Sequence, residues 1–463
     1  MDRVRVWLCG TAVVMGVALA AIGGSWSSSA DDSGKELRFA VLGDNRPGTR
    51  TARQPYVHKL LLKELKARKP IAVLNTGDII VGGTDDSLTL RRMFEEFMKT
   101  VSPLEVPLHV APGNHDYFNR PSRALFAEMV GKPYYSMDYG SCHFVILCSE
   151  EEGHVSRLSR EQFLWLKRDL EAHRQMPHLF VFVHRPLYPV GPHAGDSFDK
   201  YPAHRDSLAA LFLEHGVDIV FVGHEHLYHD ATYGGLRQVI TGGAGAPLYA
   251  PPDSGGYFHF IMVTVRGKEV LTEVVRVDDP YEKAEEAFRQ RKPAEVLNLM
   301  DEVLNDSPDQ SDAHLYKAVA YLQAREPGRA AEELAAFLKG EGRVAAAYER
   351  AGRMLLKHGL WEQARALYRE FANDKPASPE AYLGLGESFF HLSYADSASL
   401  CLERAVELDS LAPKLRFLAG QLYENGKKVV EAIRHYQAAV RLGPETSYGL
   451  RAAKRLAELK PGQ

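Results

Sequence analysis

Short apolar runs alternate with longer amphipathic stretches between Leu37 and Val277. Each run is too short for a typical helix and ends in glycine, aspartate or histidine. This is the pattern of buried strands that deliver polar residues at their carboxyl ends. In chain order the runs are RFAVLGD, IAVLNTGD, LHVAPGNHD, HFVILCS, LFVFVHRP, DIVFVGHEH and RQVITGG. The alternation of strands and helices predicts an α/β domain.

The pattern changes to apolar-polar alternation after Tyr257, in the stretch FHFIMVTVRGKEVLTEVVRV. Two alternating runs are joined there across Arg266-Gly267-Lys268. Alternation on both sides of a short glycine-containing connection is typical of a β-hairpin. We expect this hairpin to close the first domain, which we place at residues 36–277.

Helical periodicity replaces the strand pattern beyond Asp278-Asp279-Pro280, where Ala, Leu, Glu and Arg dominate. Three consecutive units start 34 residues apart, at Ala345, Pro379 and Pro413. Each unit repeats a glycine, an alanine and a bulky residue in register: Gly352, Gly386 and Gly420; Ala364, Ala398 and Ala432; and Tyr368, Leu402 and Tyr436. A looser unit starts near Asp312 and a degenerate one near Pro280, and a final helix would cap the array.

The 34-residue period and its aligned positions resemble the tetratricopeptide (TPR) repeat. This resemblance implies an all-α solenoid over residues 280–463, with a concave face that binds a protein or peptide partner. The residues expected on that face are Glu349, Arg353, Leu383, Glu387, Phe390, Phe417, Gln421 and Glu424. Phe390 and Phe417 either anchor a partner or pack against the next repeat.

The length and charge of the chain narrow its class. A chain of 463 residues exceeds what a single hydrophobic core normally supports, so two folded units are expected. The net charge of −4 provides no broad basic field for nucleic acid or an anionic membrane. Cys142 and Cys148 share one predicted strand. At about 3.3 Å per residue they are too far apart to form a disulfide, so we expect buried thiols.

The first 30 residues have the pattern of a targeting segment. Two arginines precede an apolar run from Val6 to Ile22, and a small and polar stretch follows it. Cleavage after Ala20 or Ala30 would make this a signal peptide. An N-terminal anchor is the alternative, because the run is close to the roughly 17 residues that can span a bilayer. Either reading predicts an exported protein that is periplasmic, extracellular or membrane-anchored facing outward.

Five polar clusters follow the predicted strands. They are Gly43-Asp44-Asn45-Arg46, Gly77-Asp78, Gly113-Asn114-His115-Asp116, His184-Arg185-Pro186 and Gly223-His224-Glu225-His226. Loops after parallel strands converge on one edge of a sheet. Two carboxylates, an asparagine oxygen and three imidazoles suit a pair of metal ions about 3.5–4 Å apart that share one carboxylate. Such a pair fits phosphoryl chemistry, because it can bind phosphate oxygens and hold a bridging water that loses its proton near neutral pH.

The ordered set resembles the signature of the calcineurin-like metallophosphoesterases, which runs GD, GD, GNHD or GNHE, a histidine and GHxH. The resemblance covers roughly Glu36 to Val277. It implies an α/β sandwich of two mixed β-sheets flanked by helices. It also implies a metal-dependent hydrolase of phosphate mono- or diesters with two divalent or transition-metal ions, which could be manganese, iron or zinc.

The resemblance also assigns roles to single residues. It implies six metal ligands, with Asp78 shared between the two ions: Asp44, Asp78, Asn114, His184, His224 and His226. His115 resembles the histidine that contacts the phosphate and protonates the leaving oxygen. Asp116 would orient and polarise that imidazole through its second nitrogen.

Arg46 departs from the commonest pattern, because many members of the family have a histidine ligand there. The related purple acid phosphatases use a tyrosine instead, at the position of Val81. Three interpretations remain open. In the one we favour, water fills the gap and Arg46 binds a substrate phosphate through its planar fork, as a catalytic residue. In the second, Arg46 pairs with a nearby carboxylate. In the third, the site holds one metal ion and the domain binds without catalysis.

The predicted function is therefore an exported metal-dependent phosphoesterase whose TPR repeats bind a protein partner. One alternative is a nuclease or cyclic-nucleotide phosphodiesterase of the same class. It is disfavoured because such relatives typically keep the histidine that Arg46 replaces, and because no basic strip marks a nucleic-acid path. A non-catalytic scaffold that senses phosphate or metal is the alternative from a different class.

Overall fold

The computed structural model of the chain describes residues 36–48 and 53–459. The predicted targeting segment and Cys9 lie outside these residues. None of the helices within them is both long and apolar enough to cross a bilayer. Cys142 and Cys148 are buried free thiols, as expected.

The first β-sheet has five strands in the order β11-β10-β1-β2-β3. The strands β1, β2 and β3 are parallel, and β10 runs antiparallel to β1. Their bounds are β1 Leu37–Leu42, β2 Val73–Asn75, β3 Leu108–Val110, β10 His259–Arg266 and β11 Glu269–Arg276. The predicted hairpin is confirmed, since β10 and β11 pair along their whole length and Gly267 turns with φ of +58°.

The second sheet has six strands in the order β4-β5-β6-β7-β9-β8. Its four inner strands are parallel, and both edge strands are antiparallel. The bounds are β4 Tyr135–Tyr139, β5 Cys142–Ile146, β6 His178–Val183, β7 Ile219–Val222, β8 Tyr228–Tyr233 and β9 Leu236–Thr241. The strands β4 and β8 were not predicted from the sequence. Neither has a buried apolar run, because each lies at an edge and is only partly covered.

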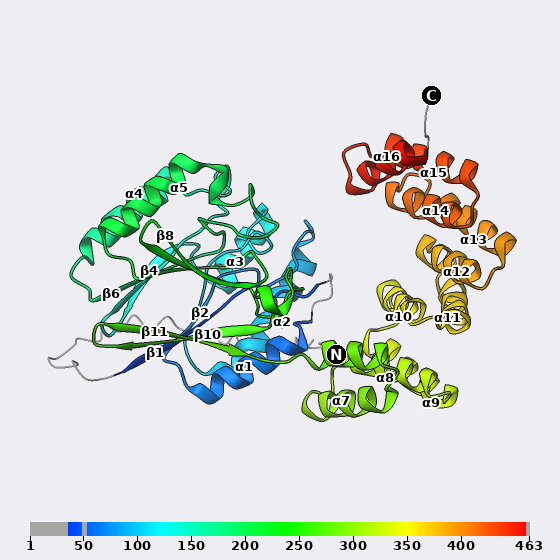
Figure 1. Cartoon of the computed structure of the whole chain (residues 1–463), viewed down its shortest axis with the longest axis horizontal. Helices are drawn as coiled ribbons and strands as arrows, with labels where there is room; N and C mark the ends of the chain where they lie inside the picture. Colours follow the sequence, from blue (N-terminus) through cyan, green and yellow to red (C-terminus); the bar gives the residue numbers. More distant parts are fainter. Residues whose placement is uncertain (1–35, 49–52, 460–463) are drawn as a thin grey trace, which may run out of the picture.

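The two sheets pack face to face around an aromatic and aliphatic core that includes Phe39, Phe144, Phe182 and Phe221. Separate apolar clusters join the outer face of each sheet to helices, so the domain has four layers (Figure 1). The helices are α1 Tyr56–Arg68, α2 Ser87–Val101, α3 Arg120–Met129, α4 Arg160–Ala172 and α5 Pro202–Glu214. Short 3-10 helices occur at η1 Ser102–Leu104, η2 Phe198–Lys200 and η3 Pro252–Ser254. The predicted sandwich of two mixed sheets flanked by helices is confirmed.

Eleven helices make up the described chain from Pro280 onward, and they rise beside the first domain as a curved array (Figure 1). They are α6 Pro280–Arg289, α7 Pro293–Asp306, α8 Ser311–Gln323, α9 Pro327–Gly340, α10 Ala345–Lys357, α11 Trp361–Asp374, α12 Pro379–His391, α13 Ala395–Leu408, α14 Pro413–Asn425, α15 Val429–Leu442 and α16 Ser447–Leu459. The repeated glycines lie where the two helices of a pair touch. A Cβ atom on Gly352 would lie 2.2 Å from the Tyr368 ring, and one on Gly420 would lie 2.7 Å from the Tyr436 ring.

The two phenylalanines predicted for the concave face differ in exposure. Phe417 is 1% exposed, and its ring packs against those of Tyr436 and Tyr448. It is therefore a core residue of the last repeats and not an anchor for a partner. Phe390 is only partly buried, with its ring edge-on to His391.

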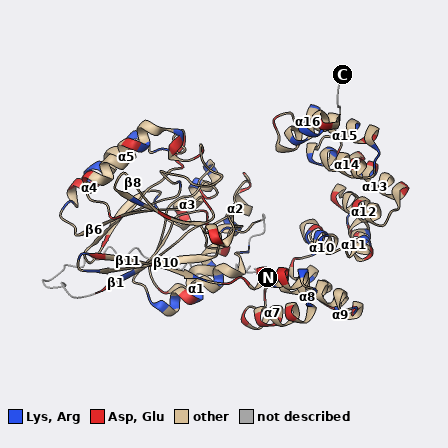
Figure 2. Ribbon diagram, in the orientation of Figure 1, with Lys and Arg blue, Asp and Glu red and all other residues tan. Residues whose placement is uncertain are grey.

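Helix α1 joins the two parts of the molecule. Tyr56 belongs to the hydrophobic core of the repeats, and its ring meets that of Tyr281 edge-on at 6.2 Å. The Tyr56 hydroxyl donates to Asp306 at 3.1 Å, and Lys63 pairs with the same carboxylate at 2.8 Å. Lys59 likewise pairs with Asp309, just after α7, so basic residues of α1 and acidic residues at and after the end of α7 are paired at this junction, where α1 and α7 lie close together (Figure 2). Arg53, just before α1, donates to oxygens of α8 and α9.

Candidate metal centre

Six predicted ligands lie in loops that follow five strands. Asp44 follows β1, Asp78 follows β2 and Asn114 follows β3. His184 follows β6 in the second sheet, and His224 and His226 follow β7. The structure brings all of these loops together where the carboxyl ends of the two sheets meet. Ligand atoms of Asp44, Asp78 and His184 lie within 4.8 Å of one another.

His184 presents one ring nitrogen to a group of hydrogen-bond acceptors. Its Nδ1 lies 2.9 Å from the carbonyl oxygen of Thr76, which places the ring proton on Nδ1 and a lone pair on Nε2. That Nε2 is 2.9 Å from Asn114 Oδ1 and 3.4 Å from Asp78 Oδ1. It is also 3.2 Å from His224 Nδ1. Converging oxygen and imidazole acceptors fit a metal cation, which satisfies all of them at once.

A second group of acceptors forms around Asp44. His226 Nδ1 is 2.7 Å from the carbonyl oxygen of Pro247, so His226 Nε2 faces Asp44 Oδ1 at 3.5 Å with its lone pair. The His226 ring stacks on Tyr249 with centroids 4.0 Å apart, which holds its orientation. The Asp44 carboxylate also accepts the backbone N–H of His224. The donor set thus fits two neighbouring ions, although Asp44 and His226 alone give one of them few protein ligands.

The backbone at the site is tightly constrained. Asp44, Asp78 and His224 have φ of 59°, 59° and 69°, in the left-handed region that non-glycine residues seldom adopt. The neighbouring glycines leave room for the carboxylates. A Cβ atom on Gly113 would lie 2.3 Å from Asp78 Oδ1, and one on Gly223 would lie 2.4 Å from Asp44 Oδ2. Glycine before each polar residue is therefore a requirement of packing.

Electrostatics at the centre favour a bound cation. Burial opposes ionisation of Asp78, but the positive charges of His184, His115 and Arg46 outweigh it and lower the Asp78 pKa. Burial would lower the pKa of His184, but the carboxylates of Asp78 and Asp44 outweigh burial and raise it. The carboxylates thus draw positive charge to the His184 ring, as they would to a metal ion.

His115 lies beside Asp78 with its ring partly exposed. Its backbone N–H donates to Asp78 Oδ1 at 3.0 Å. Its Nδ1 lies 2.6 Å from the carbonyl oxygen of Val81, and its Nε2 lies 3.8 Å from Asp78 Oδ2. The Val81 carbonyl therefore fixes the ring so that Nε2 faces the centre.

The structure contradicts the predicted role of Asp116. Its carboxylate accepts the backbone N–H groups of Asp78 at 2.7 Å, Ile79 at 2.8 Å and Gly113 at 3.1 Å, and it is fully buried beneath them. Burial, followed by the charge of Asp78, raises the pKa of Asp116 to about 7. Asp116 thus shapes the loop that carries Asp78, while a backbone carbonyl orients His115.

Arg46 lies against the carboxylate predicted to bridge the two ions. Its Nε is 3.4 Å from Asp78 Oδ2, and its backbone N–H donates to the Asp78 carbonyl oxygen at 3.0 Å. The buried Nε has no hydrogen-bond acceptor among the described residues. Arg46 therefore forms an ion pair with Asp78 beside the centre, while its Nε still lacks a hydrogen bond.

Three further residues lie around His224, and none of them was predicted as a site residue. His224 Nε2 lies 3.2 Å from an Arg185 Nη1 and 3.7 Å from Asp196 Oδ2. Arg185 forms a buried ion pair with Glu150 at 2.6 Å, and the His193 ring packs 3.9 Å from that of His224. Arg185 belongs to the polar cluster His184-Arg185-Pro186 that was identified from the sequence, but no role was assigned to it. The loop that carries His193 and Asp196 has no periodicity that would place it near the site.

The fold and the cluster define the class of the protein. Two mixed sheets carry carboxylate, amide and imidazole groups at a shared edge, and a helical-repeat solenoid follows them. A family model described as calcineurin-like phosphoesterase matches residues 37–228. A model described as tetratricopeptide repeat matches residues 281–348, 320–379, 349–398 and 394–445. The chain therefore contains a calcineurin-like metallophosphoesterase domain followed by TPR repeats.

Several curated proteins are similar to the first domain. The human serine/threonine-protein phosphatase CPPED1 is 29% identical over 188 residues, which are 38% of this chain and 58% of that protein. The tartrate-resistant acid phosphatase type 5 of Sus scrofa is 26% identical over 243 residues, 44% of this chain and 69% of that protein. The probable inactive purple acid phosphatase 27 of Arabidopsis thaliana is 28% identical over 265 residues, 46% of this chain and 42% of that protein. The chain thus spans little more than half the length of CPPED1.

Among solved structures, a dimetal phosphatase from Danio rerio is similar with a TM-score of 0.40 and 18% identity, and the match covers 51% of this chain and 98% of that one.

Proposed function

We propose that the first domain is a metal-dependent phosphoric ester hydrolase, acting on phosphate mono- or diesters with two divalent or transition-metal ions. The observation that carries this proposal is the convergence of acceptor atoms from Asp44, Asp78 and His184 within 4.8 Å. Carboxylate and imidazole groups in such an arrangement suit manganese, iron or zinc. The match to the calcineurin-like phosphoesterase model supports the reaction class.

In this proposal the metal ions, Asp78 and His115 have separate roles. When bound, the metal ions supply Lewis-acid activation of water and neutralise charge on the phosphate. Asp78 would hold both ions, with Asn114 and the imidazoles oriented toward them. His115 keeps its Nδ1 on the Val81 carbonyl, so in the protonated ring Nε2–H would be free to protonate the leaving oxygen.

Arg46 would bind the substrate phosphate in this proposal. Its guanidinium lies beside Asp78, and its Nε has no hydrogen-bond acceptor among the described residues. A planar guanidinium donates two parallel N–H groups to phosphate oxygens, which adds both affinity and orientation. This role explains why a residue that never coordinates metal occupies a position at the centre.

One observation favours a second candidate, a non-catalytic scaffold. Arg46 already pairs with Asp78, the carboxylate on which both ions would depend. Hydrolysis of 4-nitrophenyl phosphate and of bis(4-nitrophenyl) phosphate by the same metal-loaded sample separates the proposals. Turnover of the monoester supports a phosphatase, and preference for the diester supports a phosphodiesterase. No turnover of either, with metal present, supports the scaffold.

We further propose that the TPR repeats hold a protein or peptide partner on their concave face. The TPR match supports this role, and partly buried Glu387 and Phe390 of α12 supply a carboxylate and an aromatic ring for contact. Burial raises the pKa of Glu387, and His391 and Arg353 oppose that rise. Glu387→Lys together with Phe390→Ala should abolish capture of a partner that the native chain retains, and unchanged capture would contradict this surface.

Export is proposed from the pattern of residues 1–30 alone, as a signal peptide or as an N-terminal anchor. A fusion of these residues to a reporter that is active only outside the cytoplasm tests it. Reporter activity supports export, and its absence contradicts it. Amino-terminal sequencing of the exported fusion distinguishes the two forms, because cleavage after Ala20 or Ala30 would leave a new amino end.

A further inference from the structure

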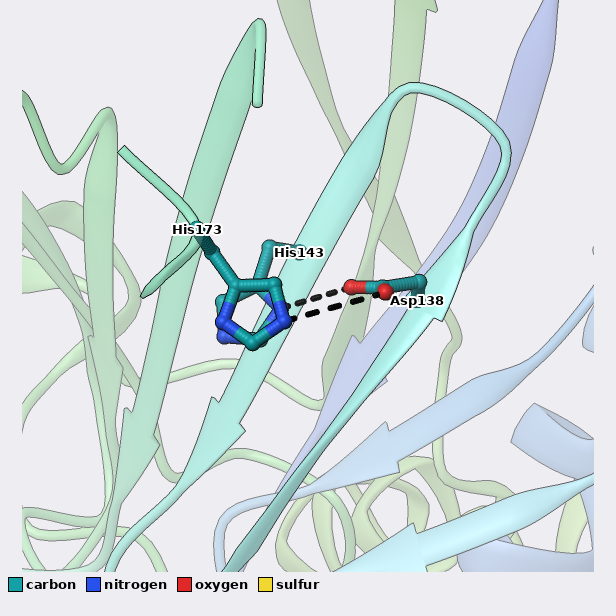
Figure 3. A group of neighbouring side chains, drawn as sticks. All are labelled: Asp138, His143 and His173. Atoms are coloured by element: carbon teal, nitrogen blue, oxygen red, sulfur yellow. Dashed lines mark hydrogen bonds and ion pairs between the residues drawn. The ribbon is translucent and has the colours of Figure 1, made fainter. Parts of the chain in front are cut away.

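A second cluster of histidine and carboxylate side chains lies away from the candidate metal centre. Asp138 is near the end of β4, His143 is near the start of β5, and His173 directly follows α4 (Figure 3). The strands β5 and β6 are parallel, and the centre uses His184, which follows the carboxyl end of β6. His143 is therefore at the opposite end of the second sheet from the centre.

The two histidine rings of this cluster stack and face one carboxylate. Their centroids are 3.7 Å apart and their planes differ by 14°. Asp138 Oδ1 lies 2.6 Å from His143 Nδ1, and Asp138 Oδ2 lies 4.0 Å from His173 Nε2 (Figure 3). His143 is 1% exposed, while His173 is 29% and Asp138 50% exposed. The cluster thus opens to solvent on the side of Asp138.

Asp169 engages the far nitrogen of each ring. Its Oδ2 lies 2.9 Å from His143 Nε2, and its backbone carbonyl oxygen lies 2.7 Å from His173 Nδ1. Ser136 Oγ donates to Asp169 Oδ1 at 2.7 Å, which holds the carboxylate in place. His173 therefore places its proton on Nδ1 and a lone pair on Nε2, whereas His143 hydrogen-bonds to a carboxylate through both nitrogens and offers a lone pair on the Asp138 side only when Nδ1 loses its proton.

One ligand atom from each of Asp138, His143 and His173 thus lies within 4.8 Å of the others, and the two stacked rings would turn toward a shared ion because imidazole lone pairs lie in the ring plane. With His143 neutral, two imidazole lone pairs next to a carboxylate repel one another unless a proton or a metal cation lies between them. Ligand atoms at about 2.0–2.2 Å from one zinc ion lie up to roughly 4.4 Å apart, so the 4.0 Å separation of His173 and Asp138 suits a shared ion. The closer pair, at 2.6 Å, can widen by rotation of the exposed Asp138 carboxylate.

We propose that Asp138, His143 and His173 bind one transition-metal ion of the zinc type, separate from the candidate metal centre. Asp169 holds both imidazoles in the metal-binding tautomer, as carboxylates behind metal-bound histidines commonly do. Solvent completes the coordination on the open side. Because its ligands come from the β4–β5 hairpin and the end of α4, the ion would link the edge strand β4 to helix α4.

Protonation of His143 is the competing way to satisfy the cluster. Burial lowers the pKa of His143, but its hydrogen bonds to Asp169 and Asp138 outweigh burial and raise it. The metal-free cluster therefore holds a proton between His143 and Asp138. Zinc would displace this proton, since a metal ion and a proton use the same lone pair.

Zinc titration of the full chain tests the proposal. Asp78→Ala removes the shared ligand of the candidate centre, so zinc that this variant still binds comes from elsewhere. We expect it to retain one ion. Asp78→Ala combined with His173→Ala should lose that ion, and Asp78→Ala combined with Asp169→Asn should bind it about 10–100-fold more weakly. The same loss should not occur when Asp78→Ala is combined with His154→Ala, the matched control at a histidine outside both clusters.

Two outcomes would overturn the proposal: no zinc bound by the Asp78→Ala variant, or zinc retained unchanged after His173→Ala is added. Either one would leave the cluster as a proton-bound pair. Should Asp78→Ala not fold, elemental analysis of His173→Ala alone, zinc-loaded beside the native chain and His154→Ala, gives the same answer. A count lower by one ion supports the site, and an equal count refutes it. Failure of the catalytic proposal would instead appear as the absence of ions that depend on Asp78.

Discussion

Backbone carbonyl groups decide which nitrogen of the key histidines faces the candidate centre. His184, His226 and His115 each direct Nδ1 to a main-chain oxygen, at 2.9, 2.7 and 2.6 Å. Their Nε2 atoms therefore all point inward, those of His184 and His115 toward Asp78 and that of His226 toward Asp44. These histidines were predicted from the sequence, but His115 was expected to contact the Asp116 carboxylate, because a carbonyl contact depends on the path of the loop and not on a residue type.

Asp78 is the side chain on which the proposed centre most depends. Asp78→Ala should abolish both metal binding at the centre and turnover, since one carboxylate is asked to hold two ions. Elemental analysis and hydrolysis of 4-nitrophenyl phosphate on one sample measure both. Asp253→Ala, at an exposed acid of η3, is the control and should behave as the native chain. Full activity of Asp78→Ala would end the two-metal proposal.

His115 should matter for chemistry and not for metal binding. His115→Ala is expected to keep the native metal content and to slow turnover by roughly 10²–10⁴, the usual effect of losing a general acid. The effect should shrink for a substrate whose leaving group needs no proton, such as 4-nitrophenolate, compared with an alkyl phosphate. Equal losses on both substrates, or a loss of metal, would argue against the proton-donor role.

Substitutions of Arg46 test whether this residue binds substrate or only pairs with Asp78. If it binds phosphate, Arg46→Ala should lower kcat/KM about 10–100-fold, chiefly through KM, as expected for one lost charged hydrogen-bonding group. Arg46→Lys, which keeps the charge but not the fork, should recover part of the loss. Unchanged kinetics with altered thermal stability would instead indicate that Arg46 only pairs with Asp78.

At the scale of elements, the sequence predicted those parts whose burial is one-sided or complete. Three of the strands that carry the site, β2, β6 and β7, are fully buried runs, and the repeats recur every 34 residues, so both were visible in the sequence. The edge strands β4 and β8 were missed because their mixed polarity depends on neighbours distant in sequence. The placement of His193 and Asp196 beside His224 depends likewise on an irregular loop.

The repeated glycines offer a test of helix packing. Gly352→Ala should destabilise the repeats by about 1–3 kcal/mol, because its Cβ would meet the Tyr368 ring at 2.2 Å. Gly328→Ala is the matched control in α9, since nothing lies within 4 Å of its added Cβ. Alanine there should be neutral or slightly stabilising, as helix propensity favours it. Urea unfolding of the two variants measures the difference, and equal stabilities would contradict the close contact.

At the scale of the whole molecule, the repeats are attached close to the loop that carries Asp44. Asn45 donates to Gln54, and Gln54 donates to the carbonyl oxygen of Ile79, so these loops of the centre are linked within the first domain. The adjacent Arg53 instead reaches α8 and α9. The hydrogen bonds that hold the centre together thus run within the first domain, and those of Arg53 run between the two parts.

A chain that ends at Asp279 should therefore keep its turnover of a small ester. It should also melt at a lower temperature, because Tyr56 loses the repeat core in which it is buried. Calorimetry and hydrolysis of 4-nitrophenyl phosphate measure the two effects. Truncation would also expose the Tyr56 ring, so Tyr56→Ser in the truncated chain should increase its solubility without changing turnover. A truncated chain that is folded but inactive would mean that the repeats shape the centre.

The most direct test of the central proposal is the metal content of the chain without residues 1–30, measured with its hydrolysis of 4-nitrophenyl phosphate on the same sample. The account predicts two transition-metal ions that disappear in Asp78→Ala, together with turnover that disappears with them. No Asp78-dependent ion, and no turnover after manganese, iron or zinc is added, would contradict it and leave a non-catalytic scaffold.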